Sequence, residues 1–223
     1  MLFSANSPTI ISKADKMFFE RCCTCAEDAL AALHGKAGRV ELCECLEVGG
    51  VTPSAENIRE TVAVGLPVNV LVRPRGGDFV YSEEELEEML SSIELCRSLG
   101  VSGIVAGALR ADGSVDMDAM RKLVAAARGE DGQRSMSFTF HRAFDEAADP
   151  FTALEDIISF GCDRLLTSGQ QASAMEGTEL IAGLVKAARG RIIVMPGAGV
   201  TPLNVEQLAG LTGAGEFHGT KLY

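Results

Sequence analysis

Short segments in which apolar and polar residues alternate recur along the chain, and segments with helical spacing separate them. The clearest alternation covers residues 136–141, where apolar Met136, Phe138 and Phe140 alternate with polar residues that end at His141. A strand that lies among many strand–helix units is covered on both faces. The polar face of this strand is therefore expected to point into an interior, where His141 needs a partner.

The same pattern predicts eight strands and seven helices in regular alternation. The strands are expected at 16–23, 39–43, 68–73, 103–107, 136–141, 163–167, 191–195 and 215–218. The helices are expected at 26–34, 52–64, 82–99, 116–128, 149–160, 173–188 and 201–208. Helix-start signals support several of them, such as the capping box that runs from Ser82 to Glu85 and the pair Asp149-Pro150.

Strand–helix alternation of this length predicts a parallel sheet closed into a TIM-type (β/α)8 barrel that lacks the final helix. An open doubly wound sheet is the alternative, and the absence of a Gly-x-Gly-x-x-Gly motif after the first strand disfavours it. We expect residues 1–15 to form an N-terminal extension and residues 16–223 a single barrel domain. Without an eighth helix an apolar stripe would be bare, which predicts a homo-oligomer or a shortened version of a longer chain.

Outward positions of barrel strands face helices and must be apolar, so the alternation also assigns the inward positions. Strands six and seven are too uniformly apolar for this assignment. In the other strands the inward polar side chains are Glu20, Arg39, Glu41, Asn69, Arg73, Thr139, His141 and His218, with Cys22 and Cys43 toward the same end. Such a set indicates an active or binding site, or else a salt-bridge network that only fills the barrel.

Composition narrows the function classes. A formal net charge of −11 argues against a nucleic-acid or acidic-membrane surface, because both need a basic footprint. The sequence shows no transmembrane segment and no secretory signal, so a cytoplasmic protein is expected. The seven Cys are an odd number, which does not suggest a disulfide framework. Five of them lie between positions 22 and 45, either as soft-metal ligands or as small core residues.

The loops after the strands add candidate anion-binding residues. Arg73 and Arg75 lie beside two glycines after strand three, and arginine forks suit carboxylate or phosphate. The alternative is a glycine-rich turn in which Arg73 pairs with an inward glutamate. Gly197, Gly199 and Gly219 follow strands seven and eight, where barrels commonly bind phosphate through backbone N–H groups.

With these motifs in order, the chain resembles the CutC family of copper homeostasis proteins. The resemblance covers about residues 16–218 and is carried by Arg39-Val40-Glu41-Leu42-Cys43, Gly49-Gly50-Val51-Thr52-Pro53, Arg73-Pro74-Arg75-Gly76-Gly77-Asp78-Phe79-Val80-Tyr81, Phe140-His141-Arg142-Ala143-Phe144-Asp145, Leu166-Thr167-Ser168-Gly169-Gln170, Pro196-Gly197-Ala198-Gly199-Val200 and Glu216-Phe217-His218. The resemblance implies a TIM-type barrel and a Cu(I) site at Cys22, or its neighbour Cys23, and Cys43. Cys25 and Cys45 depart from the family pattern, as does the absence of the tail that carries the eighth helix.

Three functions follow as hypotheses. The first is a copper homeostasis protein that binds Cu(I) through Cys22 and Cys43, since thiolates are the soft ligands that Cu(I) prefers. The second is a barrel enzyme for a small anionic or phosphorylated substrate, with His141 as general acid/base and Glu20 or Glu41 as the opposed carboxylate. In this hypothesis Arg73 and the glycine loops hold the anion. The third is a binding or scaffold barrel with a purely structural network.

Overall fold

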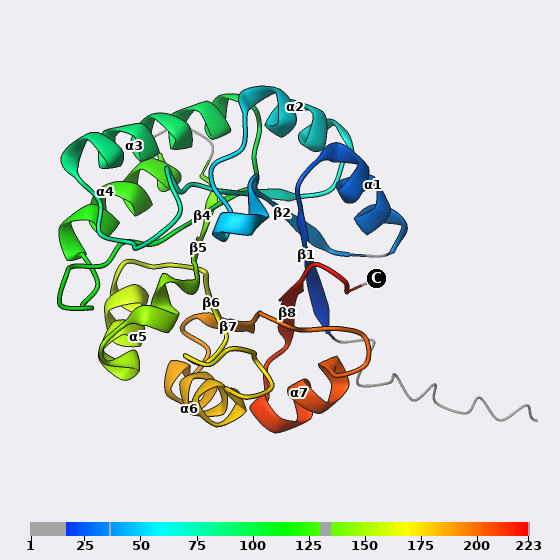
Figure 1. Cartoon of the computed structure of the whole chain (residues 1–223), viewed down its shortest axis with the longest axis vertical. Helices are drawn as coiled ribbons and strands as arrows, with labels where there is room; N and C mark the ends of the chain where they lie inside the picture. Colours follow the sequence, from blue (N-terminus) through cyan, green and yellow to red (C-terminus); the bar gives the residue numbers. More distant parts are fainter. Residues whose placement is uncertain (1–16, 36, 130–134, 223) are drawn as a thin grey trace, which may run out of the picture.

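Parallel strands line the interior of the structure and helices surround them, as Figure 1 shows in a view down the shortest axis. The structure is a computed structural model, and it describes residues 17–35, 37–129 and 135–222. The expected extension at 1–15 lies outside the described residues.

The strands and helices alternate along the described chain. The strands are β1 (Phe18–Cys23), β2 (Arg39–Leu42), β3 (Val68–Leu71), β4 (Gly103–Ala106), β5 (Ser137–Phe140), β6 (Arg164–Thr167), β7 (Ile193–Pro196) and β8 (Glu216–Gly219). The α-helices are α1 (Ala26–His34), α2 (Ala55–Ala63), α3 (Glu83–Ser98), α4 (Met117–Arg128), α5 (Pro150–Ser159), α6 (Thr178–Ala188) and α7 (Val205–Thr212). Two short 3-10 helices, η2 (Leu46–Val48) and η3 (Arg142–Glu146), follow β2 and β5.

The eight strands form one parallel sheet in the order β7-β6-β5-β4-β3-β2-β1-β8. The strands follow one another in chain order, and the last strand, β8, pairs with the first, β1. In an open doubly wound sheet the strand order instead reverses beside β1. Within the described residues no hydrogen-bonded ladder joins β7 to β8, so the barrel is nearly closed. The predicted TIM-type barrel is confirmed.

Alternate strand positions pack outward against the helices, as the parity argument predicts. The outward side chains of one large core include Phe19, Val40, Leu42, Val68, Val70, Ile104, Phe138, Phe140, Leu165, Val194 and Phe217. A separate, smaller apolar cluster lies inside the barrel and consists of Cys22, Cys43, Leu71 and Val105. Inward positions therefore carry both this cluster and the buried polar residues.

The helices capped by Ser82 and Asp149 start where the sequence places them. Ser82 Oγ accepts a hydrogen bond from Glu85 N at 3.2 Å, and Glu85 Oε2 accepts one from Ser82 N at 2.9 Å, so the capping box is present. Asp149 Oδ1 likewise accepts from Phe151 N and Thr152 N, both at 2.9 Å.

Three helix starts were wrong. The helix expected from 52 begins at Ala55, because Ser54 is its N-cap and accepts a hydrogen bond from Asn57 N at 3.4 Å. The helix expected from 201 begins at Val205, because Asn204 Oδ1 accepts from Thr201 N at 2.9 Å and closes a turn there. That helix ends at Thr212 rather than at 208. The helix expected from 173 begins at Thr178, after a turn in which Ser173 Oγ accepts from Glu176 N at 3.3 Å.

The described chain forms a turn after β8 and no eighth helix. The outer residue of β8, Phe217, is nonetheless fully buried, whereas Leu30 and Leu33 of α1 and Leu211 of α7 are exposed. Self-association through such a surface stays a prediction. None of the helices in the described ranges is both long and apolar enough to span a bilayer.

A pair of glycine substitutions tests the packing of the barrel interior. A Cβ at Gly103 would lie 2.2 Å from Ser137 Oγ and 2.3 Å from Asn69 Oδ1, so we expect Gly103→Ala to lower the free energy of unfolding by about 1–3 kcal/mol. Gly210 of α7 has no neighbouring atom within 4 Å of such a Cβ, and Gly210→Ala is expected to raise the free energy by about 0.5–1 kcal/mol. Urea unfolding measures both values, and a neutral Gly103→Ala would contradict the packing.

Candidate functional site

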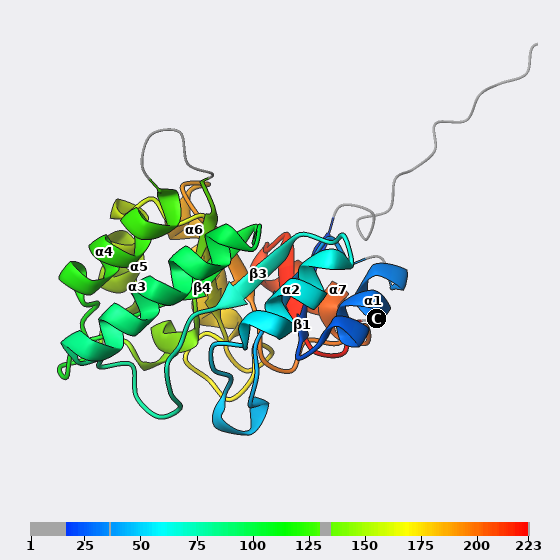
Figure 2. The ribbon, with the colours of Figure 1, turned by 90° about the horizontal axis from the view of Figure 1, so that it is seen from above.

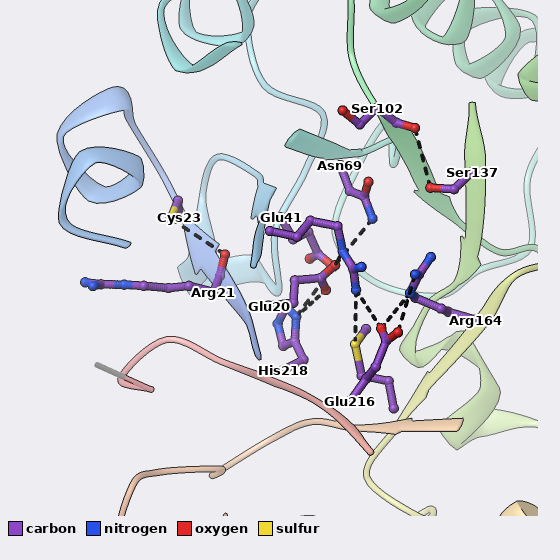
Figure 3. Close-up of polar contacts among 12 residues, drawn as sticks. Glu20, Arg21, Cys23, Glu41, Asn69, Ser102, Ser137, Arg164, Glu216 and His218 are labelled. Carbon is purple, nitrogen blue, oxygen red and sulfur yellow. Dashed lines mark hydrogen bonds and ion pairs between the residues drawn. The ribbon is translucent and has the colours of Figure 1, made fainter. Parts of the chain in front are cut away.

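The Glu20 carboxylate is the centre of the polar network inside the barrel. In the sheet register Glu20 lies beside Arg39 of β2 on one side and His218 of β8 on the other. Arg39 forms an ion pair with Glu20 Oε2, and His218 Nδ1 lies 2.8 Å from Oε1 (Figure 3). Asn69 Nδ2 of β3 donates to Oε2 at 3.3 Å. Donors from three strands therefore satisfy this fully buried carboxylate.

A second carboxylate, Glu216 of β8, is paired by two arginines. Arg39 Nη2 lies 3.0 Å from Glu216 Oε2, and Arg164 Nε of β6 lies 2.7 Å from the same oxygen. Arg39 thus bridges Glu20 and Glu216. Because Arg39, Arg164 and Glu216 each open their strand, this part of the network lies toward the amino ends of the strands.

Glu41 is the buried carboxylate without such partners. Its Oε2 has no hydrogen-bond partner among the described residues, and the group of opposite charge that lies beside it is His218, with Nδ1 at 3.8 Å (Figure 3). Burial raises the pKa of Glu41 to about 7, and attraction to His218 only partly offsets this. For Glu20, burial is outweighed by the hydrogen bond from His218 and the charge of Arg39, which lower its pKa to about 2.

His218 lies between the two carboxylates. Burial alone would lower its pKa, but the charge of Glu41 and the hydrogen bond with Glu20 raise it to about 9. His218 is therefore protonated at neutral pH and forms a charged pair with Glu20. The sequence places His218 inward, and the structure adds that it contacts both carboxylates.

Cys22 and Cys43 meet in the barrel interior, with their sulfur atoms 3.7 Å apart. Both side chains are buried, and the contact between the two thiols, together with burial, raises the pKa of Cys22. Cys23 instead faces outward, in the main core. Cys25 is half-buried and Cys45 is exposed. Of the two positions proposed in β1, Cys22 is therefore the one beside Cys43.

Cys22 and Cys43 line a cavity of about 520 Å³ at the carboxyl ends of the strands. The loops that follow the strands project from this side, including the sky-blue loop with η2 and the yellow loop after β6 (Figure 2). The wall consists of Cys22, Glu41, Cys43, Leu46, Gly49, Leu71, Arg73, Phe79, His141, Arg142, Leu166, Ala198, Gly199, Val200, Thr201, His218, Gly219, Thr220 and Lys221. The sequence-predicted thiols, Glu41 and His141 are thus brought to one space, while Glu20 lies beneath it.

His141 caps a short helix. Its Nδ1 accepts a hydrogen bond from Ala143 N at 3.2 Å at the start of η3, and its ring packs edge-on against Phe79 with centroids 4.9 Å apart. Burial and the charge of Arg73 lower the pKa of His141 to about 3, so the ring is neutral at pH 7. Its Nε2 is buried without a partner among the described residues. The enzyme hypothesis gains no support from this geometry, since such a ring is a weak base.

Arg73 ties two loops together. Its guanidinium donates to Val48 O and Gly50 O, both at 3.1 Å, and to Gly77 O at 2.6 Å, while it stacks on the Phe79 ring. The alternative expectation, in which Arg73 pairs with an inward glutamate, is not what the structure shows.

The other candidate anion-binding residues lie in different places. Arg75 pairs with Glu85 and Asp78 and is not part of the cavity wall. Gly199 and Gly219 are part of that wall, and a Cβ at Gly197 would lie 3.5 Å from the His218 ring. Anion binding by this set stays a prediction.

Asp145, the last residue of the 140–145 motif, is a structural residue that the sequence did not predict. Asp145 accepts hydrogen bonds from Thr167 Oγ1 at 2.5 Å, from Ser168 N at 3.0 Å and from Gln170 N at 3.2 Å. It joins the corner after β5 to the loop after β6. A short run of Thr, Ser, Gly and Gln after a strand is the signal that such a loop needs an acceptor.

The fold and this cavity define a TIM-type barrel with buried thiols, a carboxylate and an imidazolium at the carboxyl ends of its strands. The chain belongs to the CutC family, whose model matches residues 17–223. A family protein CutC from Parabacteroides distasonis is 49% identical over 205 residues, which cover 91% of this chain and 82% of that relative. One from Xylella fastidiosa is 54% identical over 193 residues, 85% of this chain and 69% of the relative.

Solved structures agree with the family assignment. The crystal structure of a candidate copper homeostasis protein CutC from Streptococcus agalactiae superposes with a TM-score of 0.86 at 32% identity, and covers 93% of this chain and 100% of that chain. A 2,3-dimethylmalate lyase superposes with a TM-score of 0.65 at 13% identity, over 92% of this chain and 76% of the lyase. The second similarity shows the fold alone.

The unpaired Glu41 predicts a pH-dependent stability effect. Its pKa rises from 4.5 to about 7 on folding, because the fold favours the protonated carboxyl group. The stability that this preference supplies is fully present below pH 4.5, is lost as the pH rises from 4.5 through 7, and stays lost above that. We expect Glu41→Gln to raise the free energy of unfolding at pH 8 by about 1–3 kcal/mol, and by much less at pH 5.

Urea unfolding at the two pH values measures the effect, and Glu20→Gln is the matched control. The pKa of Glu20 falls to about 2 on folding, so its charge stabilises the fold at pH 8 and Glu20→Gln is expected to destabilise it there. A Glu41→Gln variant that is less stable than the wild type at pH 8 would contradict the analysis.

Proposed function

We propose that this chain is a copper homeostasis protein that binds Cu(I) between Cys22 and Cys43. The observation that carries the proposal is the 3.7 Å separation of the two sulfur atoms at the cavity wall, where Cys22 lies in β1 and Cys43 directly follows the neighbouring strand β2. Metal–sulfur bonds of about 2.3 Å let one ion join sulfurs up to about 4.6 Å apart. Membership of the CutC family and the copper homeostasis name of the Streptococcus relative support the choice of metal.

The surroundings of the two thiols suit a soft ion. Leu71 and Val105 complete the apolar cluster around them, and Cu(I) prefers thiolates to the oxygen ligands that water or carboxylates supply. Because the pKa of Cys22 is raised, the thiol carries its proton until an ion replaces it. Binding is therefore accompanied by proton release, as is usual when a metal takes a thiol ligand.

Cysteine substitutions test this site. In a titration of the reduced protein against a chromophoric Cu(I) chelator, Cys22→Ser and Cys43→Ser are each expected to weaken binding by more than about 100-fold, beyond the loss typical of an outer-shell change. Cys45→Ser and Cys96→Ser are the matched controls, since Cys45 is exposed and Cys96 is buried in the main core. A double Cys22→Ser, Cys43→Ser variant that holds Cu(I) as tightly as the wild type refutes the proposal.

A further inference from the structure

A second set of donor atoms shares Cys22 with the thiol pair. The sulfur of Cys22, a carboxylate oxygen of Glu41 and a ring nitrogen of His218 all lie within 4.8 Å of one another. They come from the adjacent strands β1, β2 and β8, and in the register Cys22 lies directly beside Glu41. All three side chains reach the cavity wall, so an ion has access to them.

The unpaired oxygen of Glu41 indicates that this set can hold a cation. Glu41 is 6% exposed and its Oε2 has no hydrogen-bond partner among the described residues. Glu20 and Glu216, in contrast, are each held by two or more donors. A buried carboxylate oxygen without a partner is unfavourable, and a bound cation would satisfy it. Of these three carboxylates, Glu41 is thus the one left for a ligand.

The contact between His218 and Glu20 supplies the support that a metal-ligating histidine usually has. Glu20 Oε1 lies 2.8 Å from His218 Nδ1. A carboxylate on one ring nitrogen fixes the orientation of the imidazole and increases the basicity of the other nitrogen. With Nδ1 engaged by Glu20, Nε2 is the ring atom left to bind an ion. Because His218 is protonated at neutral pH, the ion displaces the proton from Nε2 into solvent.

The donor types select the class of ion. One thiolate, one carboxylate and one imidazole are the ligands of a borderline divalent cation, whereas Cu(I) favours sulfur and Mg²⁺ or Ca²⁺ favours oxygen alone. Once the ion has displaced the proton of the Cys22 thiol, the thiolate and the Glu41 carboxylate together balance a charge of +2. Three protein ligands beside a cavity leave a coordination position for water or a small ligand.

We propose that Cys22, Glu41 and His218 form a binding site for a borderline divalent cation, for which Zn²⁺ is the test ion. Tetrahedral Zn²⁺ sites place their donors about 3.3–3.8 Å apart, so side-chain rotations close the set around the ion. Because Cys22 also belongs to the proposed Cu(I) site, Zn²⁺ and Cu(I) exclude each other. The divalent site does not need Cys43 and does not depend on the Cu(I) proposal.

The test is a titration of the reduced, metal-free full chain with Zn²⁺ against a chromophoric chelator. The wild type is expected to bind one Zn²⁺, and Glu41→Gln, which preserves the side-chain shape, to weaken binding by more than about 100-fold. Cys22→Ser is expected to lose both Zn²⁺ and Cu(I), whereas Cys43→Ser loses only Cu(I). The matched control Cys45→Ser keeps both ions, since its thiol is exposed and outside the cavity wall.

The variants also separate the two proposals. If Cys43→Ser keeps Cu(I) while Glu41→Gln loses Zn²⁺, the Cu(I) site is wrong and the divalent site stands. If Glu41→Gln binds Zn²⁺ as tightly as the wild type, or if the wild type binds no Zn²⁺, the divalent site is wrong. The absorption spectrum of the Co²⁺-loaded wild type reports the number of thiolate ligands without relying on any variant. One thiolate is expected, and two thiolates would overturn the proposal.

Discussion

The requirement that buried charges be paired governs the interior of this barrel. Glu20 has no exposed surface, yet it is charged because Arg39, His218 and Asn69 converge on it from three other strands. Removing one partner of such a buried pair typically costs about 3–5 kcal/mol. The contacts of Glu20 therefore hold β8, β1, β2 and β3 in one register.

The division of partners among three carboxylates separates structure from binding. Glu20 and Glu216 use the available arginines, with Arg39 shared between them and Arg164 added on the second. Glu41 lies two residues closer to the carboxyl end of β2 than Arg39, which is level with Glu20. Glu41 forms no ion pair with an arginine of the described chain, so burial raises its pKa. Of the three carboxylates, the one with an unpaired oxygen is thus the one at the cavity wall, beside Cys22 and His218.

Around that cavity, several titratable side chains form hydrogen bonds that hold the surrounding loops in place. His141 caps η3, and Asp145 of the same helix holds the loop after β6. Arg73 donates its hydrogen bonds to loop carbonyls rather than to a carboxylate. These contacts hold the loops around the cavity in place, while the two thiols, Glu41 and His218 supply candidate metal ligands in its wall.

The sequence by itself determined the strand–helix alternation, the caps at Ser82 and Asp149, and the inward parity of Cys22 and Cys43, because each depends on neighbours a few residues away. It did not determine where α7 begins, since Asn204 had two local hydrogen-bonding choices, turn or helix. Nor could it assign Arg39 to Glu20 and Glu216 while Glu41 stays unpaired. Those pairings join strands up to 177 residues apart, and only the barrel register decides which side chains meet.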